Sequence, residues 1–467
     1  MPVPKVFDAI IVGAGPGGYV CAIRCAQLGL KTAVIEREHL GGICLNWGCI
    51  PTKALLRTSE VFQTMKRAGD YGLSAEKVDF NLQDVIKRSR AIAAQLNQGV
   101  GHLLRKNKVE VRMATAEIAG ADRVFVKNGK NDVEELAASA IVIATGARAR
   151  ELPELQSDGK VVWTYKHALD PKRMPKKLLV IGSGAIGIEF ASFYNALGAE
   201  TTVVEVLERI LPAEDPEISE FARKSFSRHG MKIFANSRVR VIERSQASVA
   251  AEITQKGSKS IRDVFDTVIV AVGIDGNVEG MGLERIGVEL DRGHILVDGS
   301  CRTSAQGIFA IGDVAGPPWL AHKASHEGVM VAEILAGGSP HQVTSDKIAG
   351  CTYCHPQIAS VGLTEENAVR AGREIRVGRF PFVGNGKAIA LGEPDGLVKT
   401  IFDSETGELL GAHMIGAEVT ELIQGFVVAR QLETTESDLI HSVFPHPTLS
   451  EMMHESVLDA YGRTIHF

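Results

Sequence analysis

The chain has 467 residues, of which 45% are hydrophobic and 23% charged, and its formal net charge is −5. These values are ordinary for a globular protein of about three domains, and they exclude the basic stripe that nucleic-acid binding requires. We find no run of about 18 apolar residues to span a membrane, and the first apolar run enters a glycine loop instead of a signal-peptide cleavage site. Seven cysteines are too few for a disulfide scaffold, so we expect a reducing, cytoplasmic location.

The first predicted elements are a strand (FDAIIV, 7–12), a glycine loop, a helix and a second strand (TAVIE). The loop glycines are Gly13, Gly15 and Gly18, and the second strand ends in Glu36. Such glycines allow a tight turn, close approach to a pyrophosphate and close packing of the helix on the strand. The terminal acid accepts a hydrogen bond from a ribose hydroxyl. The pattern therefore predicts a dinucleotide site.

Two cysteines follow in the stretch GGICLNWGCIP, as Cys44 and Cys49. In a regular helix, residues five apart are separated by about 7.5 Å along the axis, beyond the usual Cα separation of a disulfide. If the two bond, the segment must be bent, which Gly48 and Pro51 allow. The alternatives are two buried cysteines without a redox role, or a metal site, for which no further ligands lie nearby. We predict no metal.

A long helix is predicted over residues 81–106, where apolar side chains recur at helical spacing. We interpret the apolar face of this helix as part of the core and not as a partner-binding surface.

The strand, glycine loop, helix and strand recur from Lys177 onward. The second set of loop glycines is Gly182, Gly184 and Gly187, and its acid is Glu205. In both copies the acid follows the first glycine by 23 residues (36 − 13 and 205 − 182). A carboxylate at Glu205 would repel the 2′-phosphate of NADP, so this site is expected to take NAD, and the first site FAD. Two such sites indicate electron transfer between two dinucleotide cofactors.

From about Lys347 the pattern changes to short strands and turns, including a predicted hairpin of LVKTIFD and ELLGAHMIG, and helices over 418–432 and 449–460. His446 precedes the last helix in the stretch HPTLSE. A dithiol enzyme needs a base that forms the attacking thiolate near neutral pH, and imidazole suits that task. A histidine in a proline turn is otherwise a surface residue more often than not. Glu451 fits a capping box with Thr448.

The stretch GGICLNWGCIPTK resembles the redox segment of the pyridine nucleotide–disulfide oxidoreductases, most closely the branch that oxidises dihydrolipoamide. The similarity extends to ATGA at 144–147, GIFAIGDV at 307–314, LAHKASHEG at 320–328 and HPTLSE at 446–451. It implies an α/β fold with two Rossmann-like dinucleotide-binding domains, for FAD and NAD, and a C-terminal α+β dimerisation domain. The expected boundaries are 1–148 with 277–346 for the FAD domain, 149–276 for the NAD domain and 347–467 for the interface domain.

The resemblance also implies roles for single residues. Cys49 would face the flavin and Cys44 the substrate, while Glu451 would hold the ring of the catalytic base, His446. Lys53 would lie near the flavin, paired with Glu189. Further cofactor-binding positions implied by the resemblance are Ala116, Gly146, Asp313, Ala321, Val239 and Gly273. The chain reads AVGIDGN at 271–277 where the family often has AVGRxPN, which puts details of the NAD cleft there in doubt.

The predicted activity is oxidation of protein-bound dihydrolipoamide to lipoamide by NAD⁺, through the cysteine pair and FAD. The implied partners are a second copy of the chain, as a homodimer, and the lipoyl domain of a 2-oxo acid dehydrogenase complex or of the glycine cleavage system. The alternatives are a glutathione-reductase-like enzyme, which Glu205 disfavours, and a mainly structural subunit of such a complex. The C-x-x-C of Cys351 and Cys354 has no second pair, and we interpret it as structural.

Overall fold

The computed structural model describes residues 5–129, 132–257 and 259–467. The chain divides into two compact units. The first comprises residues 1–54, 83–150 and 273–343, and the second comprises residues 55–82, 151–272 and 344–467. Among the described residues, no helix combines the length and the apolar character needed to cross a bilayer.

The first unit is built on a seven-stranded sheet in the order β3-β2-β1-β6-β5-β4, with β19 paired to β6. Its strands are β1 (Lys5–Val12), β2 (Thr32–Glu36), β3 (Glu110–Met113), β4 (Thr115–Gly120), β5 (Arg123–Lys127), β6 (Val133–Ile143) and β19 (Ile308–Ala310). Strands β1, β2, β3, β6 and β19 pair in parallel, and β4 to β6 form an antiparallel meander. Because helices cover the parallel part, β2 is buried along its whole length.

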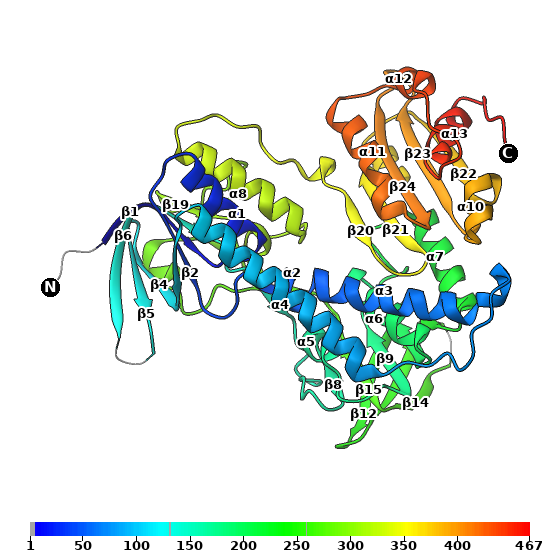
Figure 1. Cartoon of the computed structure of the whole chain (residues 1–467), viewed down its shortest axis with the longest axis horizontal. Coiled ribbons are helices and arrows are strands. Elements are labelled where there is room, and N and C mark those ends of the chain that lie inside the picture. The colour runs from blue at the N-terminus through cyan, green and yellow to red at the C-terminus, as the bar shows by residue number, and fades with distance from the viewer. Residues whose placement is uncertain (1–4, 130–131, 258) are drawn as a thin grey trace. The chain divides into compact units, whose positions relative to one another are not determined.

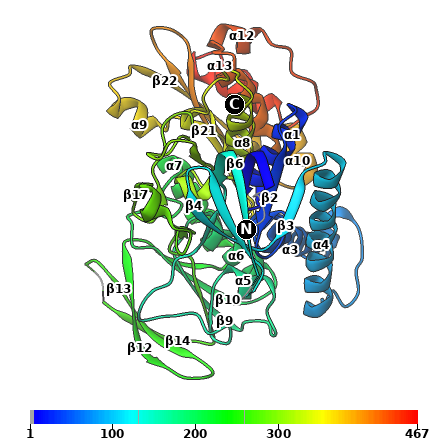
Figure 2. The same cartoon turned by 90° about the vertical axis from the view of Figure 1, so that its left-hand side faces the viewer.

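Helices α1 (Pro16–Gln27) and α8 (Ala321–Leu335) lie side by side in this unit (Figure 1). Helix α4 (Leu82–Lys106) runs beside β3 (Figure 2), and its Val100 and Leu104 share a core cluster with Ile11 of β1. The remaining elements of the unit are short: α2 (Gly42–Trp47), the start of α3 (Cys49–Lys66), β7 (Ala147–Ala149), β16 (Ile274–Gly276), η2 (Leu283–Ile286), β17 (Leu290–Asp291), β18 (His294–Ile295) and η3 (Gly312–Ala315).

The second unit contains a parallel five-stranded sheet in the order β11-β10-β9-β15-β8. Its strands are β8 (Val162–Trp163), β9 (Lys177–Ile181), β10 (Glu200–Val204), β11 (Lys232–Phe234) and β15 (Thr267–Val270). The helices of this part are η1 (Ala68–Tyr71), α5 (Tyr165–Leu169), α6 (Ala185–Ala196) and α7 (Pro216–Arg228). An antiparallel sheet adds β12 (Ser237–Arg244), β13 (Val249–Gln255) and β14 (Ile261–Phe265).

The same unit holds an antiparallel sheet in the order β20-β21-β24-β23-β22. Its strands are β20 (Gly350–Thr352), β21 (Gln357–Gly362), β22 (Ile375–Pro381), β23 (Leu397–Asp403) and β24 (Leu409–Gly416). The helices are η4 (Ser345–Lys347), α9 (Glu365–Arg370), η5 (Phe382–Gly384), α10 (Gly386–Leu391), α11 (Val419–Gln431), α12 (Glu436–His441) and α13 (Glu451–Ala460). Helices α11 and α13 bury Phe426 and Met452 against this sheet, which confirms the predicted hairpin and both predicted helices.

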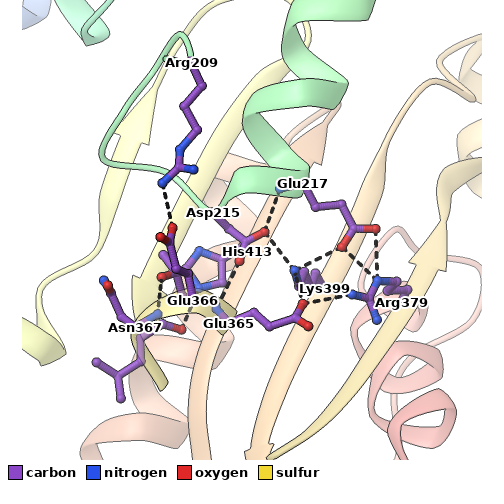
Figure 3. A network of polar contacts seen from close by, with 11 residues as sticks. Arg209, Asp215, Glu217, Glu365, Glu366, Asn367, Arg379, Lys399 and His413 are labelled. Carbon is purple, nitrogen blue, oxygen red and sulfur yellow. Dashed lines mark hydrogen bonds and ion pairs between the residues drawn. The ribbon is translucent and has the colours of Figure 1, made fainter. Parts of the chain in front are cut away.

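A buried lysine ties the two parts of the second unit together (Figure 3). Lys399 on β23 has a side chain only 2% exposed, and its Nζ lies 2.8 Å from Asp215 and 2.7 Å from Glu365. Burial lowers the pKa of Lys399, but the hydrogen bonds to these carboxylates outweigh burial and raise it. Glu217 of α7 completes the group and also accepts from Arg379 on β22. The network therefore links α7 and α9 to the antiparallel sheet.

Both repeated strand–loop–helix–strand units are confirmed. The first is formed by β1, α1 and β2, and the second by β9, α6 and β10. The α/β fold class is confirmed as well, with a largely parallel sheet in each unit.

Candidate active site

The first glycine loop joins β1 to α1 in a conformation that only glycines tolerate at two positions. Gly13 has φ of 104°, and a Cβ atom at Gly18 would lie 1.9 Å from the Gly13 carbonyl oxygen. Gly15 is the N-cap of α1, and no side chain of the described residues caps that helix end. An uncapped helix N-terminus approached only by glycine backbone fits a pyrophosphate.

Glu36 stands at the end of β2 beside this loop. Its Oε2 accepts from the Ala14 N–H at 2.8 Å and its Oε1 accepts from the Glu38 N–H at 2.8 Å. The carboxylate is buried and held by the loop backbone. This placement fits the ribose contact that the sequence predicts for the FAD site.

The second loop repeats this geometry in the second unit. Gly182 has φ of 97°, and a Cβ atom at Gly187 would lie 2.1 Å from the Gly182 carbonyl oxygen. The N-cap Gly184 faces open space, with no described atom within 4 Å of the position of a Cβ atom. Glu205 accepts from the Ser183 N–H at 2.9 Å and the Ser183 hydroxyl at 2.7 Å. These residues fit a second dinucleotide.

The cysteine pair lies where two helices meet in the first unit. Helix α2 ends at Trp47, Gly48 adopts φ −147° and ψ −116°, and α3 begins at Cys49. The expectation of a bent segment is therefore confirmed. Cys44 is in hydrogen-bond contact with Cys49, and the two lie at disulfide distance. This contact, together with burial and the charge of Cys49, raises the pKa of Cys44, while Lys53 lowers it.

Asp313 in η3 belongs to the same unit and adjoins α8, which begins at Ala321. Burial raises the pKa of Asp313, and the positive charge of Lys323 opposes that shift. Lys323 pairs with Glu327 at 3.0 Å, and Glu327 also accepts from the Gly312 N–H at 2.8 Å. Sequence reasoning missed this buried pair, although its i, i+4 spacing inside LAHKASHEG is a signal for it.

The other predicted cofactor residues are spread over both units. In the first unit, Ala116 is buried in β4, the Gly146 carbonyl accepts from the Asn277 N–H at 2.9 Å, and the Gly273 carbonyl accepts from the Arg150 N–H at 3.0 Å. In the second unit, Val239 lies half-buried in β12. Glu189 accepts from the Tyr353 N–H at 2.9 Å. Since Lys53 belongs to the first unit and Glu189 to the second, their pairing stays a prediction.

His446 and Glu451 form a pair at the start of α13. Nδ1 of His446 lies 2.9 Å from Oε1 of Glu451, and the Thr448 N–H donates to the other oxygen at 2.9 Å. Burial opposes ionisation of Glu451, but the Thr448 N–H and His446 outweigh it and lower the pKa of Glu451. Helix α13 begins at Glu451 with Ser450 as its N-cap, and none of the described side chains caps it, so the capping box expected with Thr448 is not formed. Glu451 instead holds the ring with one oxygen and accepts the Thr448 N–H, which lies ahead of the helix, with the other. With Nδ1 donating to the carboxylate, Nε2 is the basic nitrogen.

Two dinucleotide loops, a cysteine pair in hydrogen-bond contact and a histidine–glutamate pair define a class of nucleotide-dependent disulfide oxidoreductases. The sequence matches the family described as pyridine nucleotide-disulphide oxidoreductase over residues 7–328, and its dimerisation domain over residues 348–457. The chain belongs to this family. Members use FAD and NAD, and the expected cofactors and the activity class, a flavin-dependent disulfide oxidoreductase, are confirmed.

Similar proteins cover nearly the whole chain. A dihydrolipoyl dehydrogenase of Zymomonas mobilis is 56% identical over 462 residues, covering 99% of this chain and 99% of the relative. A dihydrolipoyl dehydrogenase of Rhizobium etli is 54% identical, covering 98% and 99%. The crystal structure of LpdA from Mycobacterium tuberculosis has a TM-score of 0.89 at 27% identity, covering 97% of this chain and 99% of that one.

Proposed function

We propose that this chain oxidises dihydrolipoamide to lipoamide with NAD⁺ as electron acceptor. The observation that carries the proposal is the Cys44–Cys49 contact across the break at Gly48, in the same unit as the first dinucleotide loop. The relatives named dihydrolipoyl dehydrogenase, aligned over nearly their full lengths, support the substrate.

The chain's own residues move the protons and exchange the sulfur bonds. His446, held by Glu451, accepts a proton at Nε2 from one substrate thiol, because the thiolate is the attacking species. That thiolate attacks Sγ of Cys44, the Cys44–Cys49 bond breaks, and Cys49 leaves as a thiolate. The second substrate sulfur then displaces Cys44, which takes up the remaining proton as lipoamide forms its own S–S bond. The pair has gained two electrons, and FAD supplies the chemistry that passes them to NAD⁺.

The binding residues divide between the two loops. In this proposal the first loop and Glu36 hold FAD, with Lys53, Ala116, Gly146, Asp313 and Ala321. The second loop and Glu205 hold NAD, with Val239 and Gly273, while Glu189 pairs with Lys53. The anchoring of Glu205 by Ser183 supports a preference for NAD over NADP, because the fixed carboxylate would repel a 2′-phosphate.

The dimerisation domain supports a homodimer, in which we place the partner subunit's His446 opposite the cysteine pair. Exposed apolar side chains within that domain support the assembly, among them Val443 (96% exposed), Leu432 (71%) and Ile389 (57%). The partner proposed for the whole enzyme is the lipoyl domain of a 2-oxo acid dehydrogenase complex or of the glycine cleavage system. The reducing, cytoplasmic location stays a prediction.

Steady-state assays of the purified holoenzyme test this function. Dihydrolipoamide-dependent reduction of NAD⁺ is expected for the native chain and is expected to be lost in Cys44→Ser and Cys49→Ser. Cys351→Ser is the matched control and should retain turnover, since it alters a cysteine outside the pair. Preferred reduction of glutathione disulfide by NADPH would replace the proposal by the glutathione-reductase alternative. A chain that assembles into a 2-oxo acid dehydrogenase complex but has no turnover of its own would favour the alternative of a structural subunit.

A further inference from the structure

Helix α4 does more than pack into the core. Val85, Ile86 and Ala93 are buried as predicted, whereas the apolar residues Leu96 (36%) and Leu103 (41%) are exposed. The same helix, however, also presents polar side chains to the backbone around the cysteine pair, which corrects the interpretation of its face as core packing alone. Four donors on α4 reach carbonyl oxygens of this segment: Arg90 to Asn46 (2.7 Å), Asn97 to Leu40 (2.8 Å), Ser89 to Pro51 (3.0 Å) and Arg88 to Ala54 (3.0 Å).

Arg90 is the donor that binds between the two cysteines. Its guanidinium donates to the Asn46 carbonyl, and its Cζ lies 4.5 Å from the centre of the Trp47 ring. Asn46 and Trp47 are two of the four residues that separate Cys44 from Cys49. A planar guanidinium can bond to a carbonyl and stack on an aromatic ring at the same time, which lysine cannot do.

Asn46, whose carbonyl Arg90 binds, is itself fixed by the hydrogen bonds of its side chain. Asn46 is buried, and its Nδ2 donates to the carbonyl oxygens of Leu40 at 2.9 Å and Gly42 at 2.8 Å. Its Oδ1 accepts from Asn97 of α4 at 3.3 Å. These hydrogen bonds fix the last turn of α2 against α4. They therefore fix the residues on the N-terminal side of the bend at Gly48.

We propose that Arg90 is a positioning residue for the cysteine pair. It fixes the backbone between the two sulfurs, and its permanent positive charge favours the reduced pair, in which one sulfur is a thiolate. The inference rests on the redox role proposed for the pair, but it does not depend on the identity of the substrate.

The charge is close enough to matter. Successive Cα atoms are about 3.8 Å apart, so the Cα of Asn46 is at most about 8 Å from that of Cys44 and about 11 Å from that of Cys49. One positive charge about 10–20 Å from a thiolate, at an effective dielectric of about 20, changes an equilibrium roughly four- to sixteenfold. An arginine keeps this charge at every working pH.

Other charged or titratable groups that act on Cys44 come from three elements besides its own. They are Cys49 and Lys53 on α3, Asp313 in η3 and Tyr19 on α1. Lys53 acts in the same direction as Arg90, and Asp313 acts in the opposite direction. The effect of Arg90 should therefore be measured by changing it alone.

The reaction that reports on Arg90 is reduction of the pair by an external dithiol. The dithiol gives up two electrons and two protons and closes its own S–S bond, while the Cys44–Cys49 bond breaks. One proton stays on Cys44, the second passes to a base or to solvent, and Cys49 is left as the thiolate. A nearby positive charge stabilises only the reduced side of this equilibrium.

The experiment poises holoenzyme in dithiothreitol redox buffers and follows the long-wavelength thiolate–flavin absorbance. The variants are Arg90→Gln, which keeps a donor but loses the charge, and Arg90→Lys, which keeps the charge but loses the planar stack. Arg105→Gln is the matched control, since Arg105 is exposed in the last turn of the same helix, about 22 Å along the axis from Arg90. We expect Arg90→Gln to shift the equilibrium about tenfold toward the disulfide, equivalent to about 30 mV, and to move thiolate formation to higher pH. Arg90→Lys should shift it less than threefold, and Arg105→Gln should not shift it.

Equal shifts of the dithiol–disulfide equilibrium in Arg90→Gln and Arg105→Gln would overturn the proposal, as would an Arg90→Lys shift as large as that of Arg90→Gln. Both Arg90 variants are polar and helix-compatible, and thermal unfolding verifies that they fold. Because dithiothreitol replaces dihydrolipoamide, a native chain that responds to dithiothreitol but not to dihydrolipoamide would refute the proposed substrate and leave the role of Arg90 intact.

Discussion

Replacing Glu451 by glutamine separates the two contacts of this carboxylate. The amide oxygen of Gln can still accept from the Thr448 N–H, so the contact of residue 451 with the segment ahead of α13 is preserved. The amide nitrogen then faces Nδ1 of His446, where the carboxylate oxygen lies in the native chain. An amide donor at Nδ1 favours the tautomer with its proton on Nε2, which removes the base from the substrate side.

The size of the effect follows from the kind of bond that is lost. Hydrogen bonds to charged groups contribute about 1.5–3 kcal/mol, and the lower end applies because the His446 side chain is 81% exposed. About 1.5 kcal/mol corresponds to a loss of roughly tenfold in kcat. The free energy of unfolding should change by less than about 0.5 kcal/mol, since the contact with the Thr448 N–H remains.

Steady-state kinetics with dihydrolipoamide and NAD⁺ across pH measure this effect, and urea unfolding measures the stability. Glu455→Gln is the matched control, since Glu455 lies one turn along α13 and pairs with His466 at 2.6 Å. A Glu451→Gln variant with native kcat would show that the contact of Glu451 with His446 does not assist catalysis.

Three further predictions concern binding and stability. Gly18→Ala would place a Cβ atom 1.9 Å from the Gly13 carbonyl oxygen and so disrupt the first dinucleotide loop. The flavin content of the purified variant, measured by absorbance, should fall at least about tenfold. Gly99→Ala, where a Cβ atom meets open space, is the control and should keep its flavin. Lys399→Met leaves Asp215 buried without its cation, and urea unfolding should show a loss of about 3–5 kcal/mol; a loss below 1 kcal/mol would contradict the network in Figure 3. Burial raises the pKa of Glu214 from 4.5 to about 7, so between these values the folded carboxyl holds a proton that the unfolded one lacks, and stability falls as pH rises. Glu214→Gln should remove this slope and stabilise the protein by up to about 3 kcal/mol at pH 8, and parallel stability–pH curves for the two proteins would refute it.

The dinucleotide units could be predicted from the sequence because their constraints are local. The turn at Gly13 and the contact of Gly18 with the Gly13 carbonyl involve residues five positions apart, and only glycine satisfies both. The bend between Cys44 and Cys49 followed from their spacing on the condition that the two cysteines bond, since a regular helix holds their Cα atoms too far apart for a disulfide. These features depend on neighbours in the chain, so a single sequence displays them.

The contacts that position the site could not be predicted in the same way. Arg90 binds a carbonyl 44 residues earlier, and Lys399 binds a carboxylate 184 residues earlier. Such pairs are formed by tertiary packing and leave no periodicity or motif near either residue. For Glu451, the sequence suggested two competing roles. Its two oxygens have different partners in the structure, the His446 ring and the Thr448 N–H, and no sequence pattern displays that division.

Anaerobic titration of the holoenzyme with dihydrolipoamide tests the central claim most directly. We predict a long-wavelength thiolate–flavin charge-transfer band that reaches its maximum at two electrons per subunit, and that Cys49→Ser abolishes. A titration in which the flavin bleaches without this band, or in which the band persists in Cys49→Ser, would contradict the assignment of Cys44 and Cys49 as the electron relay.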